Sequence, residues 1–186
     1  MKLLYIFLSV WTSLLAVLEQ KTLQTDFTVT VTTESQPVTY AGHFAMHADR
    51  FTVSAFGMEA SFDGETMYLY QEETNELTLS SPTVEELMQT NPLLFAQMLA
   101  STGEMTEQPA ADGRTTLITL TPRETSSEVK RVSLRIRTRD YAPLMIEMRE
   151  KDRTTTLRLT NPQYSDAELN YTLQKEGAYL NDMREL

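Results

Sequence analysis

The sequence contains no cysteine, and only two histidines, one tryptophan and six glycines among its 186 residues. The absence of cysteine excludes disulfides, thiolate metal ligands, cysteine nucleophiles and an acylated N-terminal cysteine. The sequence also lacks a glycine-rich phosphate loop and the Gly-x-Ser-x-Gly pattern of many serine hydrolases. Few groups suited to catalysis or metal binding remain, so we expect a binding protein that is not an enzyme and has no cofactor.

Negative charge also exceeds positive charge, and the formal net charge is −10. A strongly acidic protein repels nucleic acid and anionic lipid head groups, so we expect neither as a direct partner. Basic residues exceed acidic ones only within residues 123–158. There, Arg135, Arg137 and Arg139 alternate with other residues and share one face of a predicted strand. That face is either a solvated surface or a docking patch for an acidic partner.

Long hydrophobic runs are also missing, apart from the interrupted apolar start MKLLYIFLSVWTSLLAV. This start predicts a signal peptide over residues 1–16, export to the periplasm and a single domain over residues 17–186. Cleavage after Ala16 would place Leu14 where a small residue is preferred. The alternative is an amphipathic first helix, whose apolar stripe would comprise Leu4, Leu8, Trp11, Leu15 and Leu18.

From Asp26 onward the apolar residues recur with a period of two, which is typical of half-buried strands. Further strand-like runs lie at residues 39–48, 50–56, 58–62, 115–122, 129–139, 142–151 and 154–161, and residues 61–77 predict two short strands folded back at Asp63-Gly64. With a last run at 169–174, the total is about ten or eleven strands and two or three short helices. We therefore expect an α+β fold, in which a strongly curved antiparallel sheet forms an open β-barrel capped by short lid helices.

Two helices are predicted between the strands. Thr83 and Glu86 have the spacing of a capping box. Asn91 is a good N-cap, and Pro92 suits the first position of a second helix, which is apolar on most sides and must be buried. Residues 101–113 are polar and predict a mobile loop.

One feature of the sequence, a pair of histidines, resembles a metal site only superficially. His43 and His47 are four residues apart, but strand alternation places them opposite Phe44 and Met46, with no third ligand nearby. We expect both histidines to face solvent and predict no metal site.

A second capping box, at Ser165, predicts a single helical turn near the end of the chain.

Several segments, taken in order, resemble one known family. They are TLQTDFTVTV, GHFAMHADRF, SFDGETMYLYQEETNEL, NPLLFAQML, LITLTPR and LNYTLQKEGAYLNDM. Their order and spacing resemble those of the periplasmic lipoprotein carrier LolA and its relatives. The resemblance implies an apolar cavity that holds the acyl chains of a lipoprotein in transit. It also implies two membrane partners, an inner-membrane lipoprotein-releasing ABC transporter and an outer-membrane acceptor.

The sequence departs from this family in two places. Many members have an arginine followed by proline after the second strand, where the arginine helps to hold the lid shut. Here the corresponding residues are MHADRF, and Arg50 is shifted, so the role is not transferred to it. The first helix is also short, so either it merges with the signal peptide or the true start of the protein lies upstream.

Strand alternation assigns the expected lipid-binding residues. The predicted cavity wall comprises Phe27, Val29, Val31, Phe44, Met46, Phe51, Val53, Met67 and Leu69, and the predicted lid comprises Leu94, Phe95 and Met98. Within the run Met67 to Tyr70, the aliphatic and the tyrosine side chains point to opposite faces. We favour the aliphatic pair on the cavity side, and the reverse arrangement stays open.

Together these patterns predict a monomeric periplasmic carrier that binds the acyl chains of lipoproteins. Two alternatives remain. The same fold can serve as a sensor or interaction module, or it can bind another lipid, such as a glycolipid.

Overall fold

The computed structural model of the chain describes residues 9–124 and 127–184, which form twelve strands and three helices. The helices are α1 (Val10–Gln20), α2 (Val84–Thr90) and α3 (Pro92–Thr102). The strands of the first half are β1 (Thr22–Thr32), β2 (Val38–His47), β3 (Arg50–Ala55), β4 (Met58–Phe62), β5 (Met67–Gln71) and β6 (Glu76–Ser80). Those of the second half are β7 (Glu104–Pro109), β8 (Thr115–Thr121), β9 (Val129–Arg137), β10 (Pro143–Glu150), β11 (Thr154–Ser165) and β12 (Tyr179–Asp182).

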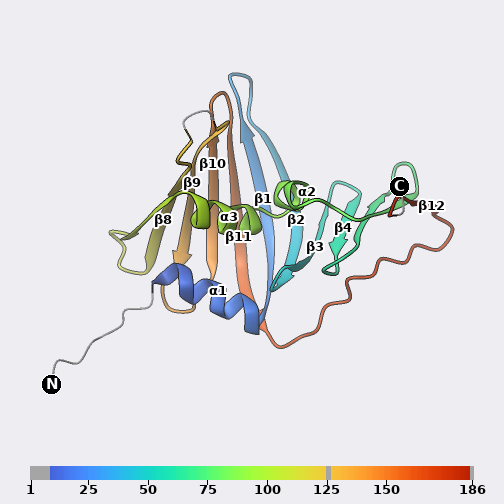
Figure 1. Ribbon diagram of the computed structural model, residues 1–186, viewed down its shortest axis with the longest axis horizontal. Coiled ribbons are helices and arrows are strands. Elements are labelled where there is room, and N and C mark those ends of the chain that lie inside the picture. The colour runs from blue at the N-terminus through green and yellow to red at the C-terminus, as the bar shows by residue number, and fades with distance from the viewer. Residues whose placement is uncertain (1–8, 125–126, 185–186) are drawn as a thin grey trace.

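All described strands belong to one sheet, in the order β12-β6-β5-β4-β3-β2-β1-β11-β10-β9-β8-β7. Neighbouring strands are antiparallel except β12 and β6, which are parallel. The sheet is curved and does not close, because β7 and β12 remain as its two edges (Figure 1). The expected fold class is confirmed, although the described strands number twelve rather than ten or eleven.

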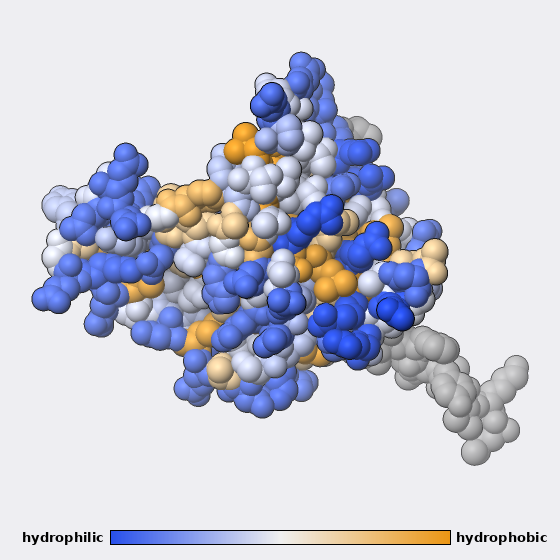
Figure 2. All heavy atoms as spheres, turned by 180° about the vertical axis from the view of Figure 1, so that it is seen from behind, coloured by the Kyte–Doolittle hydropathy of each residue, from blue (hydrophilic) through white to orange (hydrophobic). Residues whose placement is uncertain are grey.

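The three helices lie on one side of this sheet. Figure 1 shows α2 and α3 crossing in front of the strands, with α1 near one end of them. Figure 2, seen from behind, shows an opposite face that is largely hydrophilic, with apolar residues only in patches. The apolar side chains of the strands therefore turn mainly toward the helices, as period-two alternation requires of a sheet with one wet face.

Helix α1 is held to the sheet at both ends. At its start, the Ser9 side chain accepts a hydrogen bond from the Thr12 N–H, and the Glu107 carboxylate of β7 accepts the N–H groups of Val10 and Trp11 at 3.0 and 3.1 Å. These acceptors satisfy N–H groups that have no partner within the helix. At its end, the Leu18 carbonyl accepts the Ala48 N–H.

The buried face of α1 carries Trp11, Leu14 and Leu18, while Leu15 is half-buried. Residues 10–18 thus form the amphipathic helix that was one of the two alternatives, with Leu14 in place of Leu15 at the centre of the stripe. Leu4 and Leu8 lie outside the described residues. The signal peptide over residues 1–16 falls partly outside them too and stays a prediction.

A glycine in β2 allows the central strands to pack closely. A Cβ atom on Gly42 would lie 2.6 Å from the ring of Phe27 and 2.3 Å from the carbonyl oxygen of Ser54. Both distances are shorter than real Cβ contacts, so only glycine fits at this position. The aromatic ring of Phe27 therefore lies directly over the backbone of the neighbouring strand.

Two expectations for the second half of the chain are wrong. Residues 101–113, predicted to be a loop, include β7, which pairs with β8 over six residues. Edge strands with exposed side chains need no alternation, so the polar sequence contains no signal for β7. The run 169–174 forms no strand and Ser165 starts no helical turn. Instead residues 166–178, here called the tail segment, lead in extended form to β12.

The tail segment is fixed to the outer face of β3 to β6. The Ser61 hydroxyl donates to the Tyr171 carbonyl oxygen, and the Arg50 guanidinium lies 5.0 Å from the centre of the Tyr171 ring. Further along, the Lys175 ammonium contacts Glu59 at 2.6 Å. These contacts, rather than secondary structure of its own, order the tail segment.

The packing of α1 predicts a large loss of stability for Leu14→Ala. The Leu14 side chain is fully buried in the core, so its truncation should lower the free energy of unfolding by about 2 to 5 kcal/mol. Urea unfolding of the full chain measures this change. Glu19→Ala, at an exposed position of the same helix, is the matched control and should change stability by less than about 0.5 kcal/mol. Equal stability of the two variants would show that α1 does not belong to the folded domain.

Candidate functional site

A cavity of about 680 Å³ lies between the sheet and helices α2 and α3. Its volume falls within the range of roughly 300 to 1,000 Å³ that is usual for ligand pockets. The side chains around it are mostly aliphatic or aromatic and come from β1 to β3, β9 to β11 and the two helices. The cavity is thus suited to an elongated apolar ligand rather than to a polar one.

Four of the nine predicted wall residues line this cavity, namely Phe27, Val29, Phe44 and Val53. The other five face the same side of the sheet but do not reach the cavity. Met46 and Phe51 are fully buried and Met67 is nearly so, while Val31 and Leu69 are half-buried.

Met46, Phe51 and Met67 miss the cavity because neighbouring side chains of β2 to β5 and Asn91 cover them. The ring of Phe51 stacks between those of Phe44 and Phe62, with centroids 6.3 and 6.0 Å away. The Asn91 side chain covers Met46, with its amide nitrogen 3.6 Å from the sulfur. Alternation predicts the face of a strand but not how deeply a side chain is covered.

A further part of the cavity wall was not predicted. It comes from β9, β10 and β11, and comprises Val129, Val132, Ile146, Met148, Leu157 and Leu159. Ile146 with Met148 and Leu157 with Leu159 show alternation in the sequence, whereas Val129 and Val132 are three residues apart, and the pairing of β9 with β10 shifts register between them. Their place opposite β1 follows only from the pairing of Phe27 with Leu159 and of Val29 with Leu157. The sequence did not indicate that β1 and β11 are neighbours.

Helices α2 and α3 cover the cavity and begin as predicted. Thr83 and Glu86 form a capping box, in which each side chain accepts the backbone N–H of the other residue. The buried Asn91 accepts the N–H groups of Leu93 and Leu94, so α3 starts directly after α2.

The residues of α3 that face the cavity differ in part from those predicted. Phe95 lines the cavity, but Leu94 and Met98 are half-buried beside it, and Pro92 and Leu93 line it instead. Because α3 is apolar on most sides, its sequence does not indicate which side faces the ligand.

The strand β5 has two different faces. Met67 joins the core cluster and Leu69 packs against that cluster. On the opposite face, the Tyr68 hydroxyl donates to Asp63 and the Tyr70 hydroxyl donates to Asn75, at 3.3 and 3.1 Å. The aliphatic pair therefore lies on the cavity side of the sheet, as favoured, and the reverse arrangement is wrong.

The turn before β5 is organised by the carboxylate of Asp63. It accepts the N–H groups of Glu65 and Thr66 at 2.9 and 2.7 Å, in addition to the Tyr68 hydroxyl. Partial burial acts to raise the pKa of Asp63, but these hydrogen bonds outweigh it and lower the pKa below 3.8. The carboxylate form is thus favoured in the folded protein.

The two histidines of β2 differ in exposure. His43 is exposed, with its Nδ1 atom 3.0 Å from a carboxylate oxygen of Asp26, and His47 is half-buried. Within residues 9–124 and 127–184, no three metal-binding side chains lie close enough together to hold an ion. In the same ranges, no helix has the length and apolar character needed to cross a membrane.

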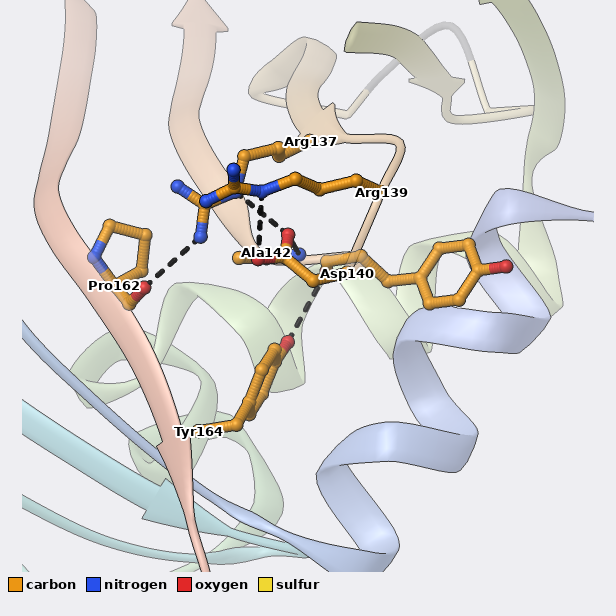
Figure 3. A network of polar contacts seen from close by, with 7 residues as sticks. Arg137, Arg139, Asp140, Ala142, Pro162 and Tyr164 are labelled. Atoms are coloured by element: carbon orange, nitrogen blue, oxygen red, sulfur yellow. Dashed lines mark hydrogen bonds and ion pairs between the residues drawn. The ribbon is translucent and has the colours of Figure 1, made fainter. Parts of the chain in front are cut away.

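The three arginines of the predicted docking patch have different environments, and Figure 3 shows two of them, Arg137 and Arg139. The Arg137 guanidinium donates to Asp140 at 2.7 Å and to the Pro162 carbonyl at 3.2 Å, tying the β9–β10 turn to β11. The hydrogen bond to Asp140 raises the pKa of Arg137. Arg139 is 77% exposed, at 3.5 Å from Asp140, and Arg135 is half-buried. Arg137 therefore has a structural role, and docking by the other two stays a prediction.

The same turn places Tyr141 in a left-handed conformation, with φ of 59°. Its carbonyl oxygen accepts the hydroxyl of Tyr164 at 3.2 Å. Burial raises the pKa of Tyr164, so this hydroxyl stays protonated and able to donate. The network thus holds a backbone conformation that is uncommon for a bulky residue.

The chain is similar to one known protein family and to several solved structures. A family model described as outer membrane lipoprotein carrier protein LolA matches residues 17–152. No curated protein sequence matches this chain. An uncharacterized conserved protein from Thermus thermophilus has the same fold, with a TM-score of 0.60 and 13% identity over 94% of this chain and 99% of that one.

Two other solved structures are more distant. A LolA superfamily protein from Nitrosomonas europaea has a TM-score of 0.46 and 10% identity, over 89% of this chain and 98% of that one. LprF from Mycobacterium bovis has a TM-score of 0.42 and 13% identity, over 88% of this chain and 94% of that one.

The hydrogen bonds of Asp63 predict a pH-dependent effect of Asp63→Ala. Because the folded pKa lies below the unfolded value of 3.8, the ionised form contributes stability above that pH, and the contribution is lost as the pH falls through the folded pKa. At pH 7 the variant should be about 1 to 3 kcal/mol less stable than the wild type. Urea unfolding at pH 7 and near pH 3 should show this difference shrinking on acidification, and a constant difference would contradict the assignment.

The network in Figure 3 predicts that the arginines are not equivalent. Arg137→Ala should lower the free energy of unfolding by about 1 to 3 kcal/mol, because it removes the guanidinium hydrogen bonds to Asp140 and to the Pro162 carbonyl. Arg135→Ala removes the same charge from the same strand and should cost less than about 0.5 kcal/mol. Thermal or urea unfolding of both variants provides the comparison, and equal losses would show that the network does not stabilise the turn.

Proposed function

Since this chain belongs to the LolA family of outer membrane lipoprotein carrier proteins, we propose that it carries lipoproteins by holding their acyl chains in its cavity. The observation that supports this most directly is the apolar space of about 680 Å³ beneath α2 and α3. Each buried CH₂ group contributes about 0.8 kcal/mol, so an acyl chain needs such a cover to cross an aqueous compartment.

The proposed carrier works by opening and closing its helical cover. Apart from the capping hydrogen bonds of Asn91, the described contacts of α3 with the sheet are mainly apolar, through Leu93, Ala96 and Leu99. Contacts of this kind are non-directional, so an acyl chain can replace the helix against the wall without leaving polar groups unpaired. We propose that α2 and α3 move together when a ligand enters or leaves.

The setting of this function is the periplasm. We propose that the protein receives lipoproteins from an inner-membrane ABC transporter and passes them to an outer-membrane acceptor, and that exposed basic residues such as Arg139 contact an acidic partner. An N-terminal leader would direct export. The end of this leader stays a prediction. Cleavage after Ala16 would cut α1 in two and remove the buried Trp11 and Leu14.

A charged residue in the cavity tests the proposal. Phe95→Glu places a carboxylate against the apolar space, where burying an unpaired charge is costly, so retention of acyl chains should fall at least about tenfold. Val84→Glu introduces the same charge on the lid helices, at a side chain that is 69% exposed, and should leave retention unchanged.

The measurement is mass spectrometry of acylated protein and free lipid that co-purify with each variant from the periplasm. Circular dichroism confirms that both variants keep the folded sheet. Wild-type retention by Phe95→Glu would show that acyl chains, if bound, do not occupy this cavity. An absence of acylated ligands from the wild-type protein would overturn the carrier function.

A further inference from the structure

Charged side chains line part of the cavity. Four of its lining residues are ionisable, Glu85 of the covering helix α2, Glu128, Glu150 of β10 and Arg153, and these four residues are here called the mouth. Glu128 precedes β9, and Glu150 and Arg153 flank the β10–β11 turn, so these three lie at the same end of the sheet (Figure 1). Ile146 and Leu159, in contrast, line the cavity further along β10 and β11.

The distance between the two ends suits an extended chain. Arg153 and Leu159 are six residues apart, and a strand rises about 3.3 Å per residue, which separates them by about 20 Å. Thr155 and Leu157 lie between them on the same wall. A ligand with an apolar chain and a polar end can therefore lie along β11 with its polar end at the mouth.

The mouth is acidic, because its three carboxylates and one guanidinium give a formal charge of −2. The guanidinium is already engaged, since Arg153 donates to both carboxylate oxygens of Glu150, at 2.5 and 2.7 Å. This hydrogen bonding, with a further contribution from Glu128, raises the pKa of Arg153. The Glu150 side chain is only 13% exposed and is part of the wall, whereas the Arg153 side chain is 51% exposed at the rim. Glu85 and Glu128 are exposed at the rim and supply the remaining negative charge.

We propose that the mouth selects acyl ligands whose polar end is positively charged, such as an acylated peptide terminus followed by basic residues. A cationic group there neutralises Glu85 and Glu128, whereas an anionic group adds like charge beside two carboxylates. Free fatty acids and anionic lipids are then disfavoured although their chains fit the cavity. This selectivity rests on the proposed function, since it requires that an acyl chain enters the cavity.

The charge of the whole chain, −10, is a different source of the same preference. Charges further away than about 10 Å are largely screened at an ionic strength of 0.1 M, whereas the mouth acts at contact distance. The effects of local and of overall charge on this preference can therefore be separated. Equal numbers of carboxylates are substituted at the mouth and elsewhere.

The test uses two palmitoylated peptides that differ only in charge, palmitoyl-Gly-Ser-Lys-Lys and palmitoyl-Gly-Ser-Glu-Glu, both amidated at the C-terminus. Each displaces the neutral fluorophore N-phenyl-1-naphthylamine from the full chain at 0.1 M salt. We expect the basic peptide to compete at a concentration about three- to tenfold lower, given two partly exposed carboxylates. The same comparison is made with the double variant Glu85→Gln and Glu128→Gln, which leaves the pair of Glu150 and Arg153 intact.

The matched control is the double variant Glu73→Gln and Glu104→Gln, which removes two exposed carboxylates that do not line the cavity. The preference for the basic peptide should disappear in the mouth variant and persist in the control. Equal competition by both peptides with the wild type, or an unchanged preference in the mouth variant, would overturn the selectivity and leave the carrier function standing. Failure of the fluorophore and of both peptides to bind would overturn the carrier function itself.

Discussion

The antiparallel pairing of β1 with β11 holds the two halves of the sheet together. It joins the first strand of the chain to one that begins more than a hundred residues later, and it runs along most of both strands. Through this pairing Phe27 and Val29 lie beside Leu159 and Leu157, so the two walls of the cavity become one continuous surface. Without it, each half would be a smaller sheet with an exposed apolar face and an unprotected edge.

The two halves then use their apolar side chains differently. From β2 to β5 the aromatic rings of Phe44, Phe51 and Phe62 pack against one another and fill the space. From β9 to β11 the side chains at the wall are aliphatic, and the space between them and α3 stays open. Part of the first half is therefore filled by its own side chains, while the cavity in which we propose that acyl chains bind lies between β1 to β3, β9 to β11 and the two helices.

Polar contacts fix the parts that apolar packing leaves undefined. Glu107 positions the start of α1, Asn91 joins α2 to α3, and Arg137 ties the β9–β10 turn to β11. Each of these contacts lies at the end of a helix or strand, where backbone groups lack regular partners. The charged side chains of the mouth differ from these, because they line the cavity, and we propose that they influence which ligands it accepts.

The sequence alone determined the features that depend on neighbouring residues. The alternation of Phe27, Val29 and Val31, the capping box at Thr83 and the opposite faces of Met67 and Tyr68 all follow from local geometry. The curved open sheet and the family resemblance follow from the order of such elements along the chain.

Only the tertiary structure decided which strands are neighbours and how deeply each side chain is covered. Val129, Val132 and Leu157 belong to the cavity wall because β9 to β11 curve around to face α3, whereas Met46 and Phe51 are excluded from it by the rings and the Asn91 side chain beside them. The exposed strand β7 and the tail segment are likewise ordered by distant partners. Periodicity is a local property of the chain, whereas depth and pairing arise from contacts between residues far apart in sequence, and no local pattern specifies them.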